Sequence, residues 1–494
     1  MENKKYAALV RENFEQAVAG GNAVKSYMDA STAVYCGKPQ PCLYIPKIFS
    51  RRAWAFLQKA AADIHAILEK VIARYLTDAE YRRLFNFDAE LERLILSDAG
   101  YPSLLPISRL DIFFNEDDFS FKFCEFNADG ASAMNEDREI NNALRRCDLF
   151  NEFAKAHDLH SCELFDSWVR EFARTAETGD TCRRQQPLSK PEVGHGFEGT
   201  CGNPHASSAK RGFAPSGFEG TCGNSHLSPA KRGFAPPVLI VDFMDSATLN
   251  EFIEFRNAFR RAGFDCEICD IRELIYEGGA LKTAAGAKID AIYRRAVTCD
   301  IMQRQDEIRP FLQAATDGAV RIIGHFRTQV IHNKKIFEIL RREETLNFLT
   351  PDEREFILRH VPETLPLVRG AFDRDEILRN KNEWLIKPED SYGSRGVFAG
   401  VDTDAEEWAA AIDSAVDTGY ILQEFCPPFR TENLDFNESP RPEFKMYNNI
   451  TGMYVYNGRL AGLYSRAGLA GVISGGTRGL TMASLVEGGC RYAN

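Results

Sequence analysis

Three side chains that offer hard oxygen ligands lie within one short stretch of the chain, RLDIFFNEDDFSFKFCEFNADG at positions 109–130. They are Asp111, Glu125 and Asn127. Carboxylate and amide oxygens suit Mg²⁺ or Mn²⁺, particularly where the ion is held partly by protein and partly by the phosphates of a substrate. The sequence therefore predicts a metal site, provided that the fold brings the three side chains together.

The stretch has the pattern of a β-hairpin. Two runs rich in Phe and Ile, 109–114 and 119–127, are separated by the acidic turn Asn115-Glu116-Asp117-Asp118. Side chains alternate between the two faces of a strand, so every second residue of the second run should share a face. These residues are Phe119, Phe121, Phe123, Glu125 and Asn127.

The register of the hairpin decides whether Asp111 reaches the other ligands. A loop with an odd number of residues, such as 116–118, would pair Asp111 with Phe123 and set it diagonal to Glu125. An even loop would place Asp111 beside Lys122. The structural alternative is that Arg109 lies opposite Glu125 as a cross-strand ion pair and Asp111 merely caps the sheet. The hairpin alone favours this alternative, because structural ion pairs are commoner than metal sites.

Cationic and small-residue segments that could meet a polyanion follow in the last third of the chain. Lys334 opens a helical run, and a strand ending in Lys387 leads into the loop Ser391–Gly396. Backbone N–H groups of such a loop can surround phosphate oxygens while Lys387 supplies a point charge. Gln423-Glu424 end another strand, and a hairpin leads into Arg466. Taken singly, each of these residues could equally be solvated or paired with a surface group.

Hydrophobic periodicity predicts the elements that position these residues. Residues 53–76 keep the rhythm of a long amphipathic helix, with Ser50 as its cap. From Pro237 an α/β layer with parallel pairing is expected. Its strands are predicted at 238–242, 264–269, 289–293 and 321–324. The layer has no GxGxxG fingerprint, so nothing in it indicates a dinucleotide.

Two near-copies interrupt the chain between these regions. They are GFEGTCGNPHASSAKRGFAP from Gly196 and GFEGTCGNSHLSPAKRGFAP from Gly217. Two polar copies at this short offset cannot stack as a solenoid. Each copy carries Cys-x₃-His, at Cys201/His205 and Cys222/His226, but this spacing matches no zinc-finger pattern. A flexible surface insertion produced by duplication is therefore favoured over a zinc site.

Composition limits the class of protein. A chain of 494 residues with 44% hydrophobic residues can form two or three globular domains. A net charge of -11 argues against general nucleic-acid or anionic-membrane binding, so a polyanionic ligand must meet a local cationic site. No apolar signal or membrane-spanning stretch is seen, which predicts a cytoplasmic protein. Most of the 13 cysteines have apolar neighbours, so reduced thiols are expected rather than a disulfide framework.

The order of these segments resembles a known family. Lys334, then Lys387 with its glycine loop, then Gln423-Glu424 and a hairpin delivering Arg466, is similar to the nucleotide-binding half of an ATP-grasp enzyme. The candidate carboxylates precede this half, as in circularly permuted ATP-grasp proteins of the glutathionylspermidine synthase-like group. That group has an Arg-x-Asp strand followed by Glu-x-Asn-Ala-Asp, which Arg109-Leu-Asp111 and Glu125-Phe-Asn127-Ala-Asp129 match.

The resemblance implies an α/β (α+β) fold with a circularly permuted ATP-grasp domain and a Rossmann-like pre-ATP-grasp domain. The implied regions are an N-terminal helical region at 1–100, a first ATP-grasp segment with the metal hairpin at 101–178, the flexible insertion at 179–236, the pre-ATP-grasp domain at 237–325 and the nucleotide-binding segment at 326–494. The sequence of the loop Ser391–Gly396 differs from the one usual in the family. The sequence also shows no sign of the Cys/His amidase that some members carry.

The resemblance also implies roles for individual residues. The residues that would contact ATP are Lys334, Lys387, Ser391, Tyr392, Gly393, Gly396, Gln423 and Glu424. Mg²⁺ or Mn²⁺ would be held by Asp111, Glu125 and Asn127. Arg109 and Arg466 would contact the transferred phosphoryl group. The implied activity is ATP-dependent ligation of a small-molecule or peptide carboxylate to an amine through an acyl phosphate. The alternatives are an ATP-grasp protein that binds ATP without catalysis and an α/β interaction protein that binds no nucleotide. The substrates and the oligomeric state cannot be predicted from the sequence.

Overall fold

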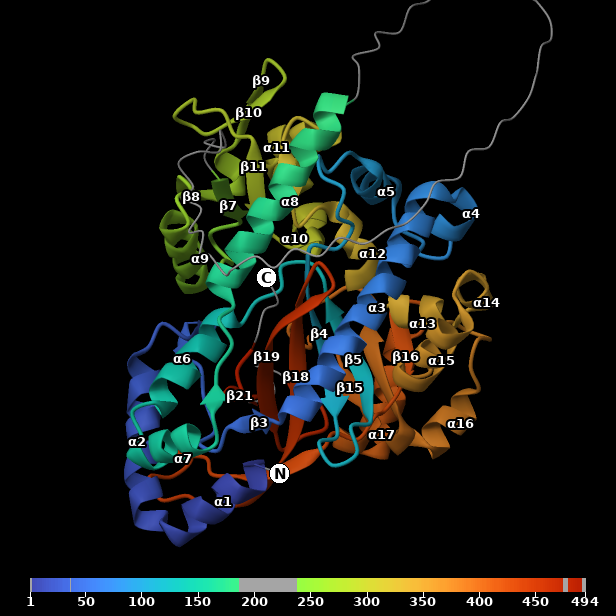
Figure 1. Ribbon diagram of the computed structural model, residues 1–494. Coiled ribbons are helices and arrows are strands. Elements are labelled where there is room, and N and C mark those ends of the chain that lie inside the picture. The colour runs from blue at the N-terminus through green and yellow to red at the C-terminus, as the bar shows by residue number, and fades with distance from the viewer. Residues whose placement is uncertain (1, 36, 186–237, 474–478, 491–494) are drawn as a thin grey trace, which may run out of the picture.

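The computed structural model of the chain describes residues 2–35, 37–185, 238–473 and 479–490 (Figure 1). The repeats with Cys201, His205, Cys222 and His226 lie outside the described residues. The insertion was expected to be irregular from 179, but helix α8 (Phe165–Gln185) continues through residues 179–185. None of the described helices combines the length and the apolar composition that crossing a bilayer requires.

The N-terminal region is mainly helical. Its helices are α1 (Glu2–Glu12), α2 (Phe14–Ala30), α3 (Arg51–Thr77), α4 (Ala79–Arg82) and α5 (Ala89–Leu96). The predicted long helix is confirmed as α3, and the Ser50 side chain accepts a hydrogen bond from the Ala53 N–H as its N-cap. Every apolar residue of its predicted stripe, from Leu57 to Tyr75, is buried.

Residues 238–323 form a four-stranded parallel sheet in the order β12-β11-β7-β8. Its strands are β7 (Val238–Asp242), β8 (Cys266–Asp270), β11 (Ala291–Arg294) and β12 (Arg321–Ile323). The predicted strands and their parallel pairing are confirmed. Helices α9 (Leu249–Arg261), α10 (Thr298–Gln303) and α11 (Arg309–Thr316) belong to the same region. Because the strands are parallel, the carboxyl ends of β7 and β11 lie at one edge of the sheet.

The largest sheet is antiparallel and joins segments from both ends of the chain. Its order is β20-β19-β18-β4-β5, with β17 also paired to β18. The strands are β4 (Ile107–Phe114), β5 (Phe121–Asn127), β17 (Arg430–Asn433), β18 (Lys445–Tyr456), β19 (Arg459–Gly468) and β20 (Leu480–Met482). Helix α3 crosses this sheet in Figure 1 and shares one hydrophobic core with β4, β5, β18 and β19. Strand β18 pairs with β4 on one side and with β19, which carries Arg466, on the other, so one strand separates Arg466 from the acidic hairpin.

Two two-stranded sheets, β1 (Val34–Tyr35) with β2 (Lys38–Pro39) and β9 (Ile275–Glu277) with β10 (Ala280–Lys282), and two larger ones complete the described fold. One of the two larger sheets is antiparallel, in the order β13 (Thr364–Pro366), β16 (Tyr420–Glu424), β14 (Trp384–Pro388) and β15 (Phe398–Ala399). The other joins β3 (Lys47–Phe49), β21 (Ser484–Glu487) and β6 (Leu159–His160). The remaining helices are α6 (Met134–Leu144), α7 (Asp148–Ala156), α12 (Gln329–His332), α13 (Ile336–Arg341), α14 (Glu343–Leu346), α15 (Pro351–His360), α16 (Arg374–Arg379) and α17 (Ala405–Ala415).

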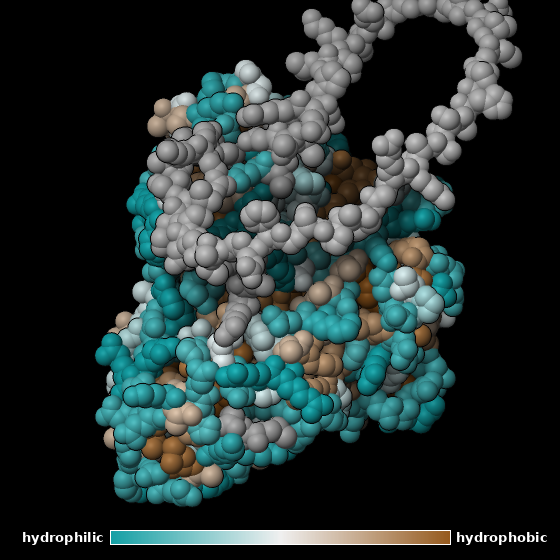
Figure 2. Space-filling model, in the orientation of Figure 1, coloured by the Kyte–Doolittle hydropathy of each residue, from teal (hydrophilic) through white to brown (hydrophobic). Residues whose placement is uncertain are grey.

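The surface seen in Figure 2 is mainly hydrophilic, and hydrophobic residues appear on it only in small separate groups. The large aliphatic and aromatic side chains are concentrated in the buried cores. Scattered exposed apolar residues are normal for a globular protein and need no partner to explain them.

A β-bulge in the β4–β5 hairpin corrects the predicted register. Near the turn Ile112 pairs with Phe123, but one step further along β4 Asp111 pairs with Glu125, so Cys124 is an extra residue on β5. The residues between the paired positions Phe114 and Phe121 make an even loop, not the odd loop expected. The even loop and the bulge together place Asp111 directly opposite Glu125, rather than diagonal to it or beside Lys122.

The bulge also changes the face on which the polar side chains lie. Strict alternation would put Glu125 and Asn127 on the face of Phe121 and Phe123, but the extra residue reverses the alternation, so that prediction is wrong. The phenylalanines, with Phe126, pack into the core under α3. Glu125 and Asn127 face the other side of the sheet, in register with Asp111 and Arg109.

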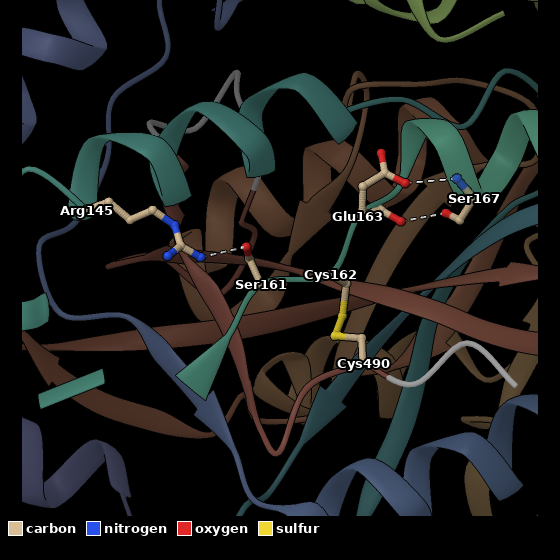
Figure 3. The surroundings of a disulfide bond; sticks show 6 residues. All are labelled: Arg145, Ser161, Cys162, Glu163, Ser167 and Cys490. Atoms are coloured by element: carbon tan, nitrogen blue, oxygen red, sulfur yellow. Dashed lines mark hydrogen bonds between the residues drawn. A yellow bond between two sulfur atoms is a disulfide. The ribbon is translucent and has the colours of Figure 1, made fainter. Parts of the chain in front are cut away.

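Cys162 and Cys490 form a disulfide across 328 positions of sequence, with their Cα atoms 5.4 Å apart (Figure 3). The expectation of reduced thiols is therefore wrong for this pair. The cause is tertiary: β6 precedes Cys162 and pairs with β21, and Gly488-Gly489 turn the chain after β21 with φ of 79° and 80°. Disulfides are uncommon in the reducing cytosol, so this bond weighs against the predicted cytoplasmic location, which stays a prediction.

Removing this disulfide should lower the free energy of unfolding by about 2–4 kcal/mol, because the unfolded chain then regains the freedom that a very long closed loop restricts. The variants Cys162→Ser, Cys490→Ser and the double variant can be compared with the wild type by thermal unfolding. Reducing agent should lower the melting temperature of the wild type to that of the double variant and leave that of the double variant unchanged. A wild-type melting temperature that is indifferent to reduction would contradict this expectation.

Candidate functional site

A cleft of about 720 Å³ lies between the β4–β5 hairpin, the parallel sheet and the loop after β14. Part of the predicted site lines it, namely Arg109, Glu125, Asn127, Tyr392, Gly393 and Arg466. The large antiparallel sheet supplies the first three and the last, and the loop supplies the other two. The fold thus brings together residues that the sequence keeps far apart.

Asp111 is fully buried and holds two arginines at the wall of this cleft. Arg109 donates from Nε to Oδ1 at 2.8 Å and from Nη2 to Oδ2 at 3.1 Å, and Arg466 donates from Nη2 to Oδ2 at 2.6 Å. The predicted structural alternative, a cross-strand pair of Arg109 with Glu125, is wrong because the register sets Arg109 opposite Asn127. Asp111 is instead the shared anchor of two guanidinium groups.

Gly452 of β18 makes room for this anchor. A Cβ atom at Gly452 would lie only 2.8 Å from Cδ of Arg109 and 2.8 Å from Oδ1 of Asp111. Only glycine therefore fits beneath the pair. Residue 452 was not among the predicted site residues, although a glycine inside a strand is a known sign of close approach by another group.

Two buried lysines lie behind the hairpin and connect it to the small antiparallel sheet. Lys334 Nζ is 3.1 Å from Oε1 of Glu125 and donates to the Ser391 carbonyl at 2.6 Å. Lys387 Nζ donates to the Cys124 carbonyl at 3.0 Å and to Oε1 of Gln423 at 2.9 Å. Both ammonium groups thus adjoin the bulged end of β5.

These lysines fix the ionisation of Glu125. Burial alone would raise the pKa of this carboxyl, but the charges of Lys334 and Lys387 outweigh it and hold the pKa at about 2. Glu125 is therefore an anion at neutral pH, in contact with the cleft on one side and with Lys334 on the other.

The loop Ser391–Gly396 has the backbone of a small-residue turn. Gly393, Ser394 and Gly396 have φ of 66°, 56° and 72°, in the region that favours glycine. The Ser391 hydroxyl donates to the Arg395 carbonyl at 3.1 Å, and the Tyr392 hydroxyl lies 3.3 Å from Oδ1 of Asp300 on α10. Tyr392 therefore ties the loop to the parallel-sheet region across the cleft.

Gln423 and Glu424 lie apart from the main cleft. Gln423 is buried between Lys387 and Thr364, to which its Nε2 donates at 3.0 Å. Glu424 lines a second pocket of about 440 Å³, together with Phe113, Lys122, His360, Cys426 and Phe429 among others. Of the predicted nucleotide residues, Tyr392 and Gly393 line the main cleft and Glu424 lines the second pocket. The others line neither space; they are Lys334, Lys387, Ser391, Gly396 and Gln423.

The main cleft also has an acidic part, which was not predicted. Glu136 in the first turn of α6 and Asp242 at the end of β7 both line it. Burial, reinforced by Glu251, raises the pKa of Glu136 to about 7, and burial raises the pKa of Asp242 to about 7. The carboxyl end of a parallel strand is a common ligand site, and this signal could have singled out Asp242 from the sequence.

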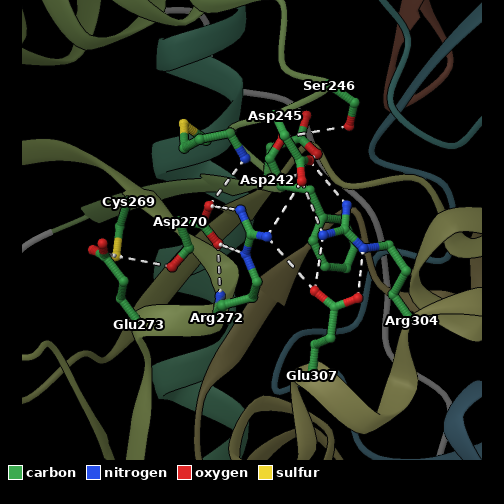
Figure 4. A network of polar contacts seen from close by, with 11 residues as sticks. Asp242, Asp245, Ser246, Cys269, Asp270, Arg272, Glu273, Arg304 and Glu307 are labelled. Atoms are coloured by element: carbon green, nitrogen blue, oxygen red, sulfur yellow. Dashed lines mark hydrogen bonds and ion pairs between the residues drawn. The ribbon is translucent and has the colours of Figure 1, made fainter.

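Arginines pair with the carboxylates that lie close to Asp242 (Figure 4). Arg304 donates to both oxygens of Asp245, at 2.9 and 3.0 Å, and Arg272 donates to Asp245 at 3.2 Å. Arg272 also binds Asp270 through two nitrogens. Asp245 and Asp270 are thus balanced by this network, and Arg272 and Arg304 also lie over the Phe243 ring.

No protein-family model and no curated protein matches the sequence. Among solved structures, a glutathione synthetase-like effector from Globodera pallida in its apo form aligns with 94% of this chain and 96% of its own, at a TM-score of 0.54 and 10% identity. The two proteins share a fold.

Two further structures align less well. A protein described as a γ-glutamylcysteine synthetase from Methylobacillus flagellatus gives a TM-score of 0.39 at 9% identity over 89% of this chain and 90% of its own. A D-cycloserine synthetase gives 0.26 at 11% identity over 51% of this chain and 91% of its own. Both scores are too low to establish a shared fold, so neither contributes to the assignment.

The residues at the hairpin fit a hard divalent cation only in part. Among the described residues, no group of three or more His, Cys, Asp and Glu side chains is spaced to hold a metal ion. Glu125 is ionised and lines the cleft together with Asn127, whose amide oxygen is the atom that can bind a cation. Asp111 has both oxygens engaged by arginines. Glu125 and Asn127 therefore suit an ion whose other ligands come from a bound phosphate.

The raised pKa of Glu136 predicts a pH-dependent cost to folding. Between the usual value near 4.5 and the folded value of about 7 the native state binds more protons than the unfolded state, so stability should fall as pH rises through this interval. Glu136→Gln removes the effect and should be more stable than wild type by about 1–3 kcal/mol near pH 8. Urea unfolding at about pH 4 is the internal control, because the carboxyl group of Glu136 is then neutral, as the amide of the Glu136→Gln variant always is. A difference in unfolding free energy between Glu136→Gln and wild type that is the same at about pH 8 as at about pH 4 would contradict the expectation.

Proposed function

We propose that the protein is an ATP-dependent carboxylate–amine ligase that forms an amide through an acyl phosphate. The observation that carries this proposal is the convergence of Glu125 with Lys334 and of Asp111 with Arg109 and Arg466 at one cleft, although 355 positions separate Asp111 from Arg466. Independent ion pairs rarely assemble cations and an ionised carboxylate around one space of this size. The shared fold with a glutathione synthetase-like protein supports the same class of reaction.

The lysines would bind the phosphates of ATP. Lys334 and Lys387 are point charges that adjoin Glu125 and the glycine loop, and the loop amides of Ser391, Tyr392, Gly393 and Gly396 are available to oxygen ligands. The second pocket, bordered by Glu424, would receive the base, with Gln423 between base and phosphates. Glu125 and Asn127 would hold Mg²⁺ or Mn²⁺, which when bound neutralises charge on the phosphates.

The chemistry requires position and charge rather than a protein nucleophile. An oxygen of the substrate carboxylate attacks the γ-phosphorus, the bond to the β–γ bridging oxygen breaks, and ADP leaves. The amine then attacks the acyl carbon, loses a proton, and phosphate leaves with the electrons of the C–O bond. Arg109 and Arg466, held by Asp111, would steady the transferred phosphoryl group and its developing charge.

Within the ATP-grasp architecture we place the chain in the circularly permuted, glutathionylspermidine synthase-like group. The order of the segments supports this placement, because the hairpin that carries Glu125 precedes the lysines in the sequence. On this proposal, residues 101–178 and 326–494 are the two parts of the ATP-grasp domain. Residues 237–325 are the pre-ATP-grasp domain, to which the four-stranded parallel sheet belongs.

The second candidate is an ATP-binding protein that has lost catalysis. The observation in its favour is that Asp111 is engaged by two arginines. Glu125, itself paired with Lys334, is then the one carboxylate left for a metal at the predicted position. A screen for ADP release separates the two candidates. Purified protein is given Mg²⁺, ATP and pools of amino acids, short peptides and amines. A ligase releases ADP only when both a carboxylate and an amine are present, whereas ATP binding with no pool-dependent ADP release would favour the second candidate.

A further inference from the structure

His332 is a buried side chain of the cleft that the proposed function does not use. It is the last residue of α12, two positions before Lys334, and only 6% of its surface is exposed. Its ring lines the cleft, and its Nδ1 atom has no hydrogen-bond partner among the described residues. Leaving a buried polar atom unpaired costs about 1–3 kcal/mol, so such an atom at the wall of a cleft indicates a missing partner.

The carboxylates around His332 are not hydrogen-bond partners of its Nδ1 atom. Glu125, Asp129 and Asp390 are its charged neighbours. Each has another partner: Lys334 for Glu125, Arg294 and the Thr298 N–H for Asp129, and the Gln329 amide for Asp390. These carboxylates are thus already paired, and the Nδ1 atom of His332 stays open to a ligand.

A second open donor lines the same cleft. The Nδ2 atom of Asn127 is buried and has no partner among the described residues. The ammonium groups of Lys334 and Lys387 both act on Glu125, which lies two positions before Asn127 on β5. Two unpaired nitrogens together with two ammonium groups suit a ligand that is rich in anionic oxygens, because amide and imidazole N–H groups both donate to such oxygens.

We propose that His332 binds the terminal phosphoryl group of the nucleoside triphosphate, with its Nδ1–H donating to a phosphoryl oxygen beside the Asn127 amide. This inference rests on the proposed function and adds to it a phosphate contact from the segment that precedes Lys334. The contact requires only a hydrogen-bond donor at this position, so an amide side chain of similar reach can replace the imidazole.

Calorimetric titration of ATP and of AMP in the presence of Mg²⁺ tests the contact. His332→Ala should weaken ATP binding about tenfold, the equivalent of one charge-assisted hydrogen bond, and leave AMP binding unchanged. His332→Gln should recover most of the loss. His65→Gln is the matched control, because His65 on α3 is equally buried at 6% exposure and lies outside the cleft.

The outcomes distinguish this inference from the proposed function. A wild-type protein that binds no ATP refutes the function itself. Wild-type binding with an unchanged His332→Ala variant overturns the His332 contact alone. An equal loss for ATP and AMP, or no recovery by His332→Gln, would mean that the ring only supports the fold. A lower affinity of His332→Ala for Mn²⁺ without nucleotide would assign the ring to the metal and overturn the proposal too.

Discussion

Asp111→Asn is expected to lower the saturated rate about a thousandfold and to destabilise the fold by about 3–5 kcal/mol. Asn keeps the shape of the side chain but removes the one charge that Arg109 and Arg466 share, with all three groups largely buried. Two buried guanidinium groups would then face each other without compensation. Steady-state rates and urea unfolding of the same preparation measure the two effects.

Asp117→Asn is the matched control for this variant. Asp117 lies in the turn of the same hairpin, and its pair with Lys4 is solvent-exposed at 3.3 Å. Exposed pairs of this kind contribute little, so neither rate nor stability should change measurably. The account of Asp111 as an anchor of two arginines fails if Asp111→Asn behaves like this control.

Lys387→Met should weaken ATP binding roughly a hundredfold, because it removes a buried charge that contacts phosphate in the ground state. Arg466→Ala should behave differently, with a near-normal dissociation constant and a saturated rate lowered about a hundredfold or more, since its contact tightens as phosphoryl transfer proceeds. Dissociation constants and saturated rates for both variants separate the two roles.

Lys335→Met controls for the loss of a lysine in the same region. Lys335 follows Lys334 in sequence, but its Nζ atom pairs with Glu389, at 3.6 Å, rather than with Glu125. Its replacement should leave ATP affinity within about twofold of wild type, as for a loosely paired charge near the surface. Wild-type ATP affinity in Lys387→Met would show that this lysine only joins β14 to the hairpin.

Local patterns were sufficient to predict the elements that carry the site. Residues close in sequence set the signal of each of these elements. Examples are the apolar stripe of α3, the apolar runs of the parallel sheet and the Asn457-Gly458 turn between β18 and β19. The apolar run that ends at Glu125 and Asn127 singled out these two residues. Arg466 was singled out because a hairpin leads into it, and Arg109 because it shares a strand face with Asp111. Their meeting in one cleft was suggested by the order of the segments and is present in the fold.

Contacts set by tertiary structure were beyond local patterns. The extra residue at Cys124 changes no propensity, yet it reverses the face of Glu125 and sets it opposite Asp111. The Cys162–Cys490 disulfide depends on the pairing of two short strands, β6 and β21. The role of Glu136 depends on burial beside Glu251, which lies in a different region of the chain. In each case the deciding neighbour is distant in sequence.

Calorimetric titration of the wild-type protein with ATP, with and without Mg²⁺, tests the central claim most directly. The account predicts saturable binding at one site that Mg²⁺ strengthens and that Lys387→Met weakens about a hundredfold. Absence of binding at millimolar ATP, or binding that is indifferent to both Mg²⁺ and Lys387→Met, would contradict the assignment of the cleft to ATP.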